Sequence, residues 1–297
     1  MITELSILIP SYNSIVEPTV RKLSILCERI TMDAPQPFHY EIIVADDGSE
    51  QTEKVEANKA INSIPHCQFF VKERNSGSAS TRNFLAIKSQ YEWLLFVDSD
   101  MEIPGMDFIM KYLPCDQTDV TNGGIKVGAT WVTHCHNLRY LYEKKAEANH
   151  TPDRRQKAGF REFRSTNFII RRSCILAHPF DERFQKSGYE DVMFGKTLQD
   201  IGATILHIDN PLILSDFENN ENFMKKTEHN LATLHQFRQE LKGYSRLIDC
   251  ADGFLSFPIR LWHSVFGRLE RRNLTSKHPR LWLYTLYRLG YYSSLKD

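Results

Sequence analysis

Short apolar runs alternate with amphipathic helical patterns through the first hundred residues, and this alternation constrains the fold more than any other feature of the sequence. Polar or glycine-containing turns separate the runs, as expected between strands and helices. Strands are expected at Leu5–Ile9, Glu41–Ala45, Cys67–Lys72 and Trp93–Val97, and helices at Pro18–Ile30, Gln51–Ile64 and Ser78–Gln90. This order predicts an α/β fold built around a mainly parallel sheet.

The second hundred residues follow a less regular pattern. In chain order we expect a strand at Gly124–Val132, a charged helix at Leu138–Asn149, a basic loop at Thr151–Arg164, an extended segment at Ser165–Ile170, a helix from Glu190 that stops at Gly202, and a strand at Thr204–Ile208. Beyond Asp216 the pattern is helical. We therefore expect a first domain over 1–215 and a helical, basic and aromatic extension over 216–297.

Composition narrows the function classes. Hydrophobic residues make up 41% of the 297, which is enough for a buried core, and 37 basic side chains balance 37 acidic ones. A chain without net charge has no global field to attract nucleic acid, so no nucleic-acid partner is expected. The scattered cysteines, the lack of a signal-peptide pattern and the lack of a long apolar stretch lead us to expect a cytoplasmic protein.

Polar turns follow the first two expected strands, as Pro10-Ser11-Tyr12-Asn13 and Asp46-Asp47-Gly48-Ser49. Ligands of open α/β sheets bind beyond the carboxyl ends of the strands, so these turns are candidates for framing a nucleoside. After the third strand, Asn75 to Asn83 form a small-residue turn that opens a helix containing Arg82, a suitable site for a diphosphate. Ordinary turn formation and helix capping are the alternatives for each motif.

Two pairs of acids complete the set of motifs. Asp98 and Asp100 follow the fourth strand. In an extended chain, side chains two residues apart point to the same side. Both carboxylates are therefore candidate ligands for one Mg²⁺ or Mn²⁺ ion. Glu190 and Asp191 begin a helix, where acids complement the helix dipole. Alternatively, a carboxylate of this pair that lies in the ligand-binding crevice beyond the strand ends could take a proton from an attacking hydroxyl.

In this order the motifs resemble those of family 2 glycosyltransferases of the GT-A fold, over about residues 5 to 215. The resemblance implies a nucleotide-diphosphate sugar donor, usually a UDP-sugar, and inversion at the anomeric carbon. It implies Asp191 as general base with Glu190 beside it, Asp98 and Asp100 as the metal and diphosphate motif, and Asn167 near the acceptor. The nucleotide-binding positions that it implies are Pro10, Tyr12, Asn13, Asp46, Asp47, Asn75, Gly77, Arg82 and Asp98.

The sequence departs from the family pattern at one position. Relatives often carry a histidine in an Asn-Pro-x-x-His pattern, but here the segment that begins at Asn210 has Leu214 in that place. His207 is a possible substitute as a metal ligand, and a structural histidine is the alternative.

The last 43 residues, 255–297, hold eight Lys or Arg against two Asp or Glu. A helix opened by Pro258 would place Trp262 and Phe266 on one face and arginines mostly away from it. This face either packs on the core or lies on an anionic membrane surface.

With what the resemblance implies, the motifs predict an inverting, metal-assisted glycosyltransferase that acts on a glycan or a lipid-linked acceptor. The alternative is a catalytically silent nucleotide- or sugar-binding module that supports a partner enzyme.

Overall fold

The computed structural model describes residues 1–185, 188–253 and 256–295. Within it the chain divides into two compact units. The first, which we call the sheet unit, comprises Met1–Lys126 and His150–Leu214, and the second, the helical unit, comprises Val127–Asn149 and Ser215–Asp297. This division differs from the expected domains in one respect, because residues 127–149 group with the C-terminal helices.

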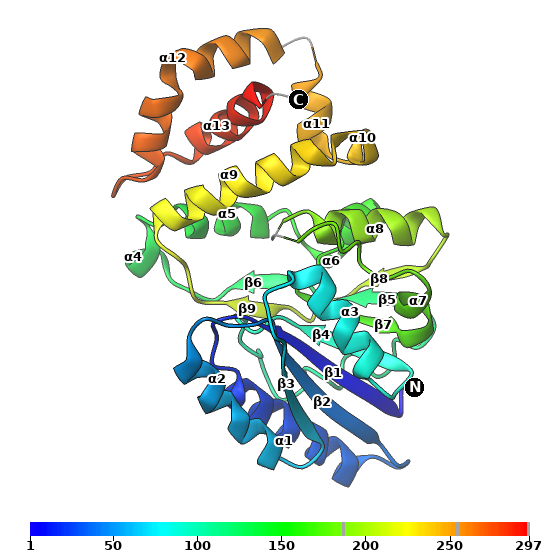
Figure 1. Cartoon of the computed structure of the whole chain (residues 1–297). Helices are drawn as coiled ribbons and strands as arrows, with labels where there is room; N and C mark the ends of the chain where they lie inside the picture. Colours follow the sequence, from blue (N-terminus) through cyan, green and yellow to red (C-terminus); the bar gives the residue numbers. More distant parts are fainter. Residues whose placement is uncertain (186–187, 254–255, 296–297) are drawn as a thin grey trace. The chain divides into compact units, whose positions relative to one another are not determined.

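A mainly parallel sheet forms the centre of the sheet unit (Figure 1). Its strand order is β3-β2-β1-β4-β7-β5-β8; β7 runs antiparallel to both of its neighbours, and the other pairs are parallel. The strands are β1 (Glu4–Ser11), β2 (His39–Asp46), β3 (Cys67–Val71), β4 (Trp93–Val97), β5 (Val120–Asn122), β7 (Asn167–Arg171) and β8 (Ile205–His207). Two further strands, β6 (Ile125–Val127) and β9 (Leu212–Leu214), pair with each other. The expected α/β class is confirmed.

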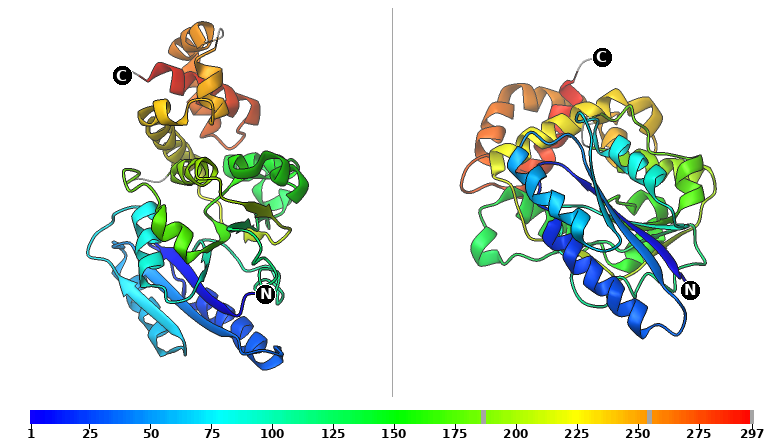
Figure 2. Two further views of the ribbon diagram at one scale, coloured as in Figure 1. Left: turned by 90° about the vertical axis from the view of Figure 1, so that its right-hand side faces the viewer. Right: turned by 60° about the horizontal axis from the view of Figure 1, so that its bottom comes forward.

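Helices cover both faces of this sheet. They are α1 (Glu17–Asp33), α2 (Thr52–Asn58), η1 (Lys59–Ser63), α3 (Ser78–Lys88), α6 (Pro152–Ala158), η2 (Gly159–Glu162), α7 (Arg172–Ala177) and α8 (Glu190–Asp200). Figure 2 shows α1 on the face opposite α3. This follows from right-handed crossovers, because the strand order moves outward from β1 to β3 and then returns past β1 to β4.

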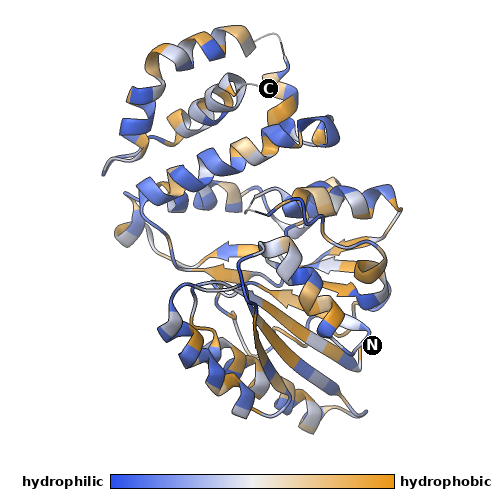
Figure 3. Ribbon diagram, viewed as in Figure 1, coloured by the Kyte–Doolittle hydropathy of each residue, from blue (hydrophilic) through white to orange (hydrophobic). Residues whose placement is uncertain are grey.

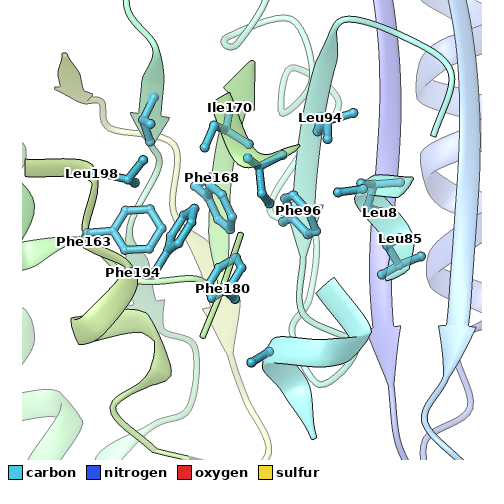
Figure 4. Close-up of a cluster of buried hydrophobic side chains, with 14 of the residues drawn as sticks. Leu8, Leu85, Leu94, Phe96, Phe163, Phe168, Ile170, Phe180, Phe194 and Leu198 are labelled. Carbon is cyan, nitrogen blue, oxygen red and sulfur yellow. The ribbon is translucent and has the colours of Figure 1, made fainter. Parts of the chain in front are cut away.

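One hydrophobic core cluster lies on the α3 face, where aromatic rings pack against one another (Figure 4). Phe96 on β4 stacks on Phe168 of β7 with their ring centroids 4.8 Å apart, and Phe180 stacks on Phe194 of α8 at 3.8 Å. Leu8 and Leu85 belong to the same cluster and are fully buried. This packing fixes the start of α8 against the sheet.

The segment Thr151–Arg164 is folded, so its expected assignment as a loop is wrong. It forms α6 and η2, and Arg155 within it is 5% exposed. The Arg155 guanidinium donates to the carbonyl oxygens of Asn122, Gly123 and Ile208. A run of basic residues usually indicates a segment exposed to solvent. The sequence therefore does not reveal that one of these arginines is buried with its N–H groups bonded to backbone carbonyls.

The expected strand at Gly124–Val132 is shorter in the structure. Only Ile125–Val127 is extended, and a short helix, α4, begins at Trp131.

The helical unit contains α4 (Trp131–His134), α5 (Leu138–Glu147), α9 (Asn220–Gln236), α10 (Arg238–Leu241), α11 (Arg246–Ala251), α12 (Ser256–Leu274) and α13 (Leu281–Ser294). Asn220 ties three of its segments together: its side chain accepts from the backbone N–H of Leu138 and donates to the carbonyl oxygens of His136 and Ser276. These bonds explain why residues 127–149 fold with the C-terminal helices. No helix among the described residues is long and apolar enough to cross a bilayer.

We expect Phe168→Ala to lower the free energy of unfolding by about 3–5 kcal/mol, because it opens a cavity between stacked rings. Chemical denaturation followed by circular dichroism measures the loss. Phe257→Ala is the matched control, since Phe257 is 65% exposed, and its cost should stay within about 0.5 kcal/mol. Equal losses in the two variants would contradict this description of the core.

Candidate active site

Parallel pairing brings the expected polar turns to one edge of the sheet. Ser11, the last residue of β1, is paired with Asp46, the last residue of β2. Strand β4 is also parallel to β1 and ends at Val97, so Asp98 leaves the sheet at the same edge. Residues that are distant in sequence, Tyr12, Asp47 and Asp98, therefore begin their turns side by side.

The turn after β2 closes on the turn after β1. The Asp46 carboxylate accepts from the backbone N–H of Ser49 at 2.8 Å and from its hydroxyl at 2.5 Å. The same hydroxyl oxygen accepts from the backbone N–H of Asn13 at 2.7 Å, and Asn13 Oδ1 accepts from the N–H of Gln51 at 3.1 Å. Asp46 is 1% exposed. In this structure Asp46 and Asn13 therefore shape the turns, which corresponds to the turn-forming alternative for these residues.

Asp47 holds the turn that follows β3. Its carboxylate accepts from Lys72 Nζ at 2.8 Å, from the backbone N–H and hydroxyl of Ser76 at 3.0 Å each, and from the backbone N–H of Gly77 at 2.8 Å. It is 5% exposed. A buried carboxylate with this many donors stabilises the turn strongly, and it ties the end of β2 to the start of α3.

Two glycines allow these turns to pack against each other. Gly48 has a φ of 68°, and a Cβ there would lie 2.5 Å from the backbone carbon of Arg74. Gly77 has a φ of 91°, and its Cβ would lie 2.4 Å from the carbonyl oxygen of Gln185. Both positions therefore require glycine on two grounds, backbone conformation and space.

Other expected nucleotide-binding residues remain accessible. Tyr12 is 40% exposed, Pro10 is half-buried, and Asn75 is exposed while its Oδ1 accepts from the N–H of Gly77 at 3.2 Å. The Tyr12 ring thus offers an open aromatic surface beside the turns.

Arg82 joins two separate acidic motifs. Its guanidinium donates from Nη2 to Asp98 Oδ1 at 2.8 Å and from Nη1 to Glu190 Oε1 at 3.4 Å. Burial lowers the pKa of Arg82, but the charges of Asp98 and Glu190 outweigh burial and hold the pKa above its usual value. Arg82 is 3% exposed and its guanidinium is bonded to the two acids, and its expected contact with a diphosphate stays a prediction.

Glu190 is fixed from three sides. Besides Arg82, the hydroxyl of Ser78 donates to its Oε1 at 2.8 Å and the backbone N–H of Gly188 donates to its Oε2 at 2.9 Å. Ser78 is the first residue of α3, so this bond joins the start of α3 to the start of α8. Ser78 and Lys72 were not among the expected site residues. Their position in the sequence could have identified them, because each follows a strand at the edge of the sheet where the strands end.

Asp191 follows Glu190 and is half-buried. Burial, and then the neighbouring charge of Glu190, raise the pKa of Asp191 to about 7, against the lowering effects of the Val192 N–H, Arg164 and Arg82. A carboxylate with a pKa near neutrality is suited to accept a proton during a reaction.

Asp98 and Asp100 fit a hard divalent cation, with one change from expectation. They flank a turn rather than lying in extended chain, since Ser99 and Asp100 are in turn conformation. Burial, and the charge of Asp100, raise the pKa of Asp98 despite Arg82, so the two carboxylates lie close enough to interact. No cluster of three or more His, Cys, Asp or Glu suited to a metal occurs among the described residues. Two carboxylates plus substrate phosphates are a common Mg²⁺ or Mn²⁺ ligand set, and the residues fit it.

The polar atoms of His207 and Asn167 are bonded within the protein. His207 Nδ1 accepts from Arg155 at 3.0 Å, its Nε2 donates to the carbonyl oxygen of Gly159 at 3.0 Å, and burial lowers its pKa to about 4. Asn167 is 1% exposed; its amide donates to the carbonyl oxygens of Gly124 and Asn210. These bonds agree with the structural alternative for His207, and the metal role of His207 and the acceptor role of Asn167 stay predictions.

We expect Asp47→Ala to destabilise the protein by about 3 kcal/mol, because it leaves the largely buried Lys72 ammonium without its carboxylate. Adding Lys72→Met removes that ammonium, so the double variant should lose less stability than the sum of the two single variants. Thermal and denaturant unfolding of the three variants checks this cycle. Strict additivity would contradict the proposed anchoring of the turn.

The chain is similar to known proteins in sequence and in structure. Residues 6–173, more than half of the chain, match the family described as Glycosyl transferase family 2. An uncharacterized glycosyltransferase of Haemophilus influenzae is 36% identical over 96 residues, which is 32% of this chain and 29% of that protein. The chain thus spans less than a third of this curated relative.

Solved structures of Staphylococcus aureus TarS share the fold. The crystal structure of its residues 1–349 has a TM-score of 0.52 at 17% identity and covers 97% of this chain and 89% of that one. The same piece in complex with UDP has a TM-score of 0.50 at 17% identity, covering 98% and 89%. The family match covers more than half of the chain, and the likeness to TarS concerns the fold: the chain belongs to glycosyl transferase family 2 and has the GT-A fold.

Proposed function

We propose that the protein is a glycosyltransferase that moves a sugar, with inversion, from a nucleotide-diphosphate sugar, most simply a UDP-sugar, to a hydroxyl of a glycan or lipid-linked acceptor. One observation supports this most directly: Arg82 bonds both Asp98, of the donor-side motif, and Glu190, next to the candidate base. Donor-side and acceptor-side groups therefore lie within the reach of one guanidinium, as a transfer reaction requires.

The donor side is proposed to lie at the edge where β1, β2 and β4 end. Tyr12 offers its exposed ring to the base, and Pro10, Asn13, Asp46 and Asp47 shape the turns around the nucleoside. Asn75 and Gly77 form the turn before α3, whose N-terminal amides favour an anion. The UDP complex of the structurally similar TarS supports a uridine diphosphate moiety in a fold of this kind.

Asp98 and Asp100 are proposed to hold Mn²⁺ or Mg²⁺ together with donor phosphates. When bound, the ion would offset the negative charge that develops on the leaving diphosphate. Arg82 keeps Asp98 in place for this role, and its buried positive charge adds to the field at the same point.

Asp191 is proposed as the general base. The acceptor O–H gives its proton to the Asp191 carboxylate while the oxygen attacks the anomeric carbon from the face opposite the leaving diphosphate. A positioned base typically contributes about 10²- to 10⁴-fold in rate. Glu190 assists in two ways, by anchoring the start of α8 through Ser78 and Arg82 and by raising the Asp191 pKa.

The acceptor is proposed to belong to a cell-surface or exported glycan that is assembled on the cytoplasmic side, with residues 255–297 in contact with a membrane surface. A catalytically silent binding module remains the second candidate. It would bind UDP with Mn²⁺ and show no turnover with any donor in a panel that measures released nucleotide.

Asp191→Asn should lower turnover by at least about 100-fold and leave UDP affinity unchanged, because it removes a base and keeps the side-chain shape. Asp200→Asn is the matched control, since Asp200 lies on the same helix, 57% exposed, in an i,i+4 pair with Lys196. Transfer assays and UDP calorimetry on both variants test the role. Full turnover by Asp191→Asn would remove it as the base.

The pH dependence should carry the signature of Asp191. Since the base must be ionised, kcat/KM should fall as the pH drops below about 7. Glu190→Gln removes a negative charge and should shift this acid limb to lower pH. Arg164→Gln removes a positive charge and should shift it to higher pH. Shifts in the same direction for the two variants would contradict the assignment.

Mn²⁺ should tighten UDP binding to the wild-type protein, and Asp100→Asn should remove most of that gain, because a carboxylate ligand is lost. Asp107→Asn, at an exposed ion pair with Lys111, is the control and should keep the gain. Calorimetry with and without EDTA measures it. Equal UDP affinity with and without metal in the wild type would refute the metal proposal.

A further inference from the structure

We propose that helix α12 docks in the plane of an anionic bilayer surface through an exposed apolar face. This face, which we call the α12 face, consists of Phe257, Leu261, Trp262, Val265, Phe266 and Leu269. The inference deepens the membrane contact of the proposed function, and its test needs no turnover, so its failure would leave the transfer reaction untouched.

The α12 face is open in the structure. Leu261, Val265 and Leu269 are 56%, 62% and 61% exposed, and they recur at a spacing of four residues along the helix. Phe257 is 65% exposed one turn before them. Figure 3 shows hydrophobic and hydrophilic residues interleaved along α12. A contiguous row of large apolar side chains in solvent marks an interaction site rather than ordinary surface.

The opposite side of α12 packs against other helices of the helical unit. Glu270 and Leu274 are 3% and 0% exposed. At Gly290 of α13 an added Cβ would lie 2.7 Å from His263 Cβ, so α12 and α13 approach closely there. Arg271 pairs with Glu221 and Glu228 of α9 and secures the end of α12. One side of α12 therefore packs in the helical unit while the α12 face stays exposed to solvent. Docking through this face requires no unfolding.

Charge favours an anionic occupant. Arg268 and Arg272 are exposed, continue the helical row of Leu261 and Val265, and make no ion pair with any described residue. The one acid of α12, Glu270, is buried and accepts from the indole N–H of Trp262 at 2.7 Å. The border of the α12 face thus carries positive charge that no acid of the helix offsets, which suits anionic lipid headgroups.

A bilayer fits this face better than a second copy of the chain. Two copies that met through their α12 faces would enclose Arg268 and Arg272 in an interface to which α12 contributes no exposed acid, and unpaired charges at an interface are unfavourable. In a bilayer the apolar side chains enter the acyl boundary while the long arginine side chains reach the headgroups. The Trp262 ring, 43% exposed with its N–H already bonded, adds apolar area without an unpaired donor.

Flotation of the full chain with vesicles tests the proposal. The wild type should float with vesicles of phosphatidylglycerol and phosphatidylcholine in equal parts, and less with phosphatidylcholine alone. The variant Leu261→Ser/Val265→Ser/Leu269→Ser should lose at least about tenfold in partitioning. The matched control Ile25→Ser/Met32→Ser/Ile87→Ser, which removes three exposed apolar side chains of the sheet unit, should float like the wild type.

A charge variant separates the two contributions. Arg268→Gln/Arg272→Gln should weaken binding to the anionic vesicles by about fivefold per arginine and leave binding to neutral vesicles unchanged. Unfolding curves that match the wild type show that the variants are folded. Unchanged flotation of the folded serine variant would overturn the proposal. So would a wild-type dimer that this variant dissociates without any change in flotation, because the α12 face would then be a protein interface.

Discussion

The site depends on one buried guanidinium. Arg82 on α3 reaches Asp98 beyond β4 and Glu190 at the start of α8, so three segments of the chain converge on it. A buried charge is costly unless it is paired, and pairing here uses carboxylates that would themselves be costly to bury alone. Arg82 therefore compensates both acids, and removing it would leave Asp98 and Glu190 without their shared cation. This mutual dependence is what places the candidate base close to the candidate donor site.

The turns around Arg82 are rigid for a related reason. Asp47 binds the donors of the following turn, Gly48 and Gly77 let the backbones approach, and Ser78 joins α3 to Glu190. Each bond satisfies a buried polar group, so the edge of the sheet is already organised before a ligand binds, which favours catalysis by orientation and fixed charges. The same crowding raises the pKa of Asp191, since burial and Glu190 both disfavour its ionised form.

The sequence predicted those features of the protein that depend on neighbouring residues in the chain. The early strands and helices follow from apolar runs and turns, and the edge position of Tyr12, Asp47 and Asp98 follows from parallel pairing. The contacts of Arg82, His207 and Asn167 did not follow, because each depends on which partner the folded chain brings to it. Arg155 is the clearest case: in sequence it belongs to a basic stretch, and in the structure backbone carbonyls surround it.

A crystal structure of the protein with UDP and Mn²⁺ tests the central claim most directly. We expect the diphosphate and the metal at Asp98 and Asp100, with the Arg82 guanidinium still bonded to Asp98 and Glu190 and the Asp191 carboxylate facing the open side of the diphosphate. A nucleotide bound away from this edge, or an Arg82 that releases both carboxylates in the complex, would contradict the account.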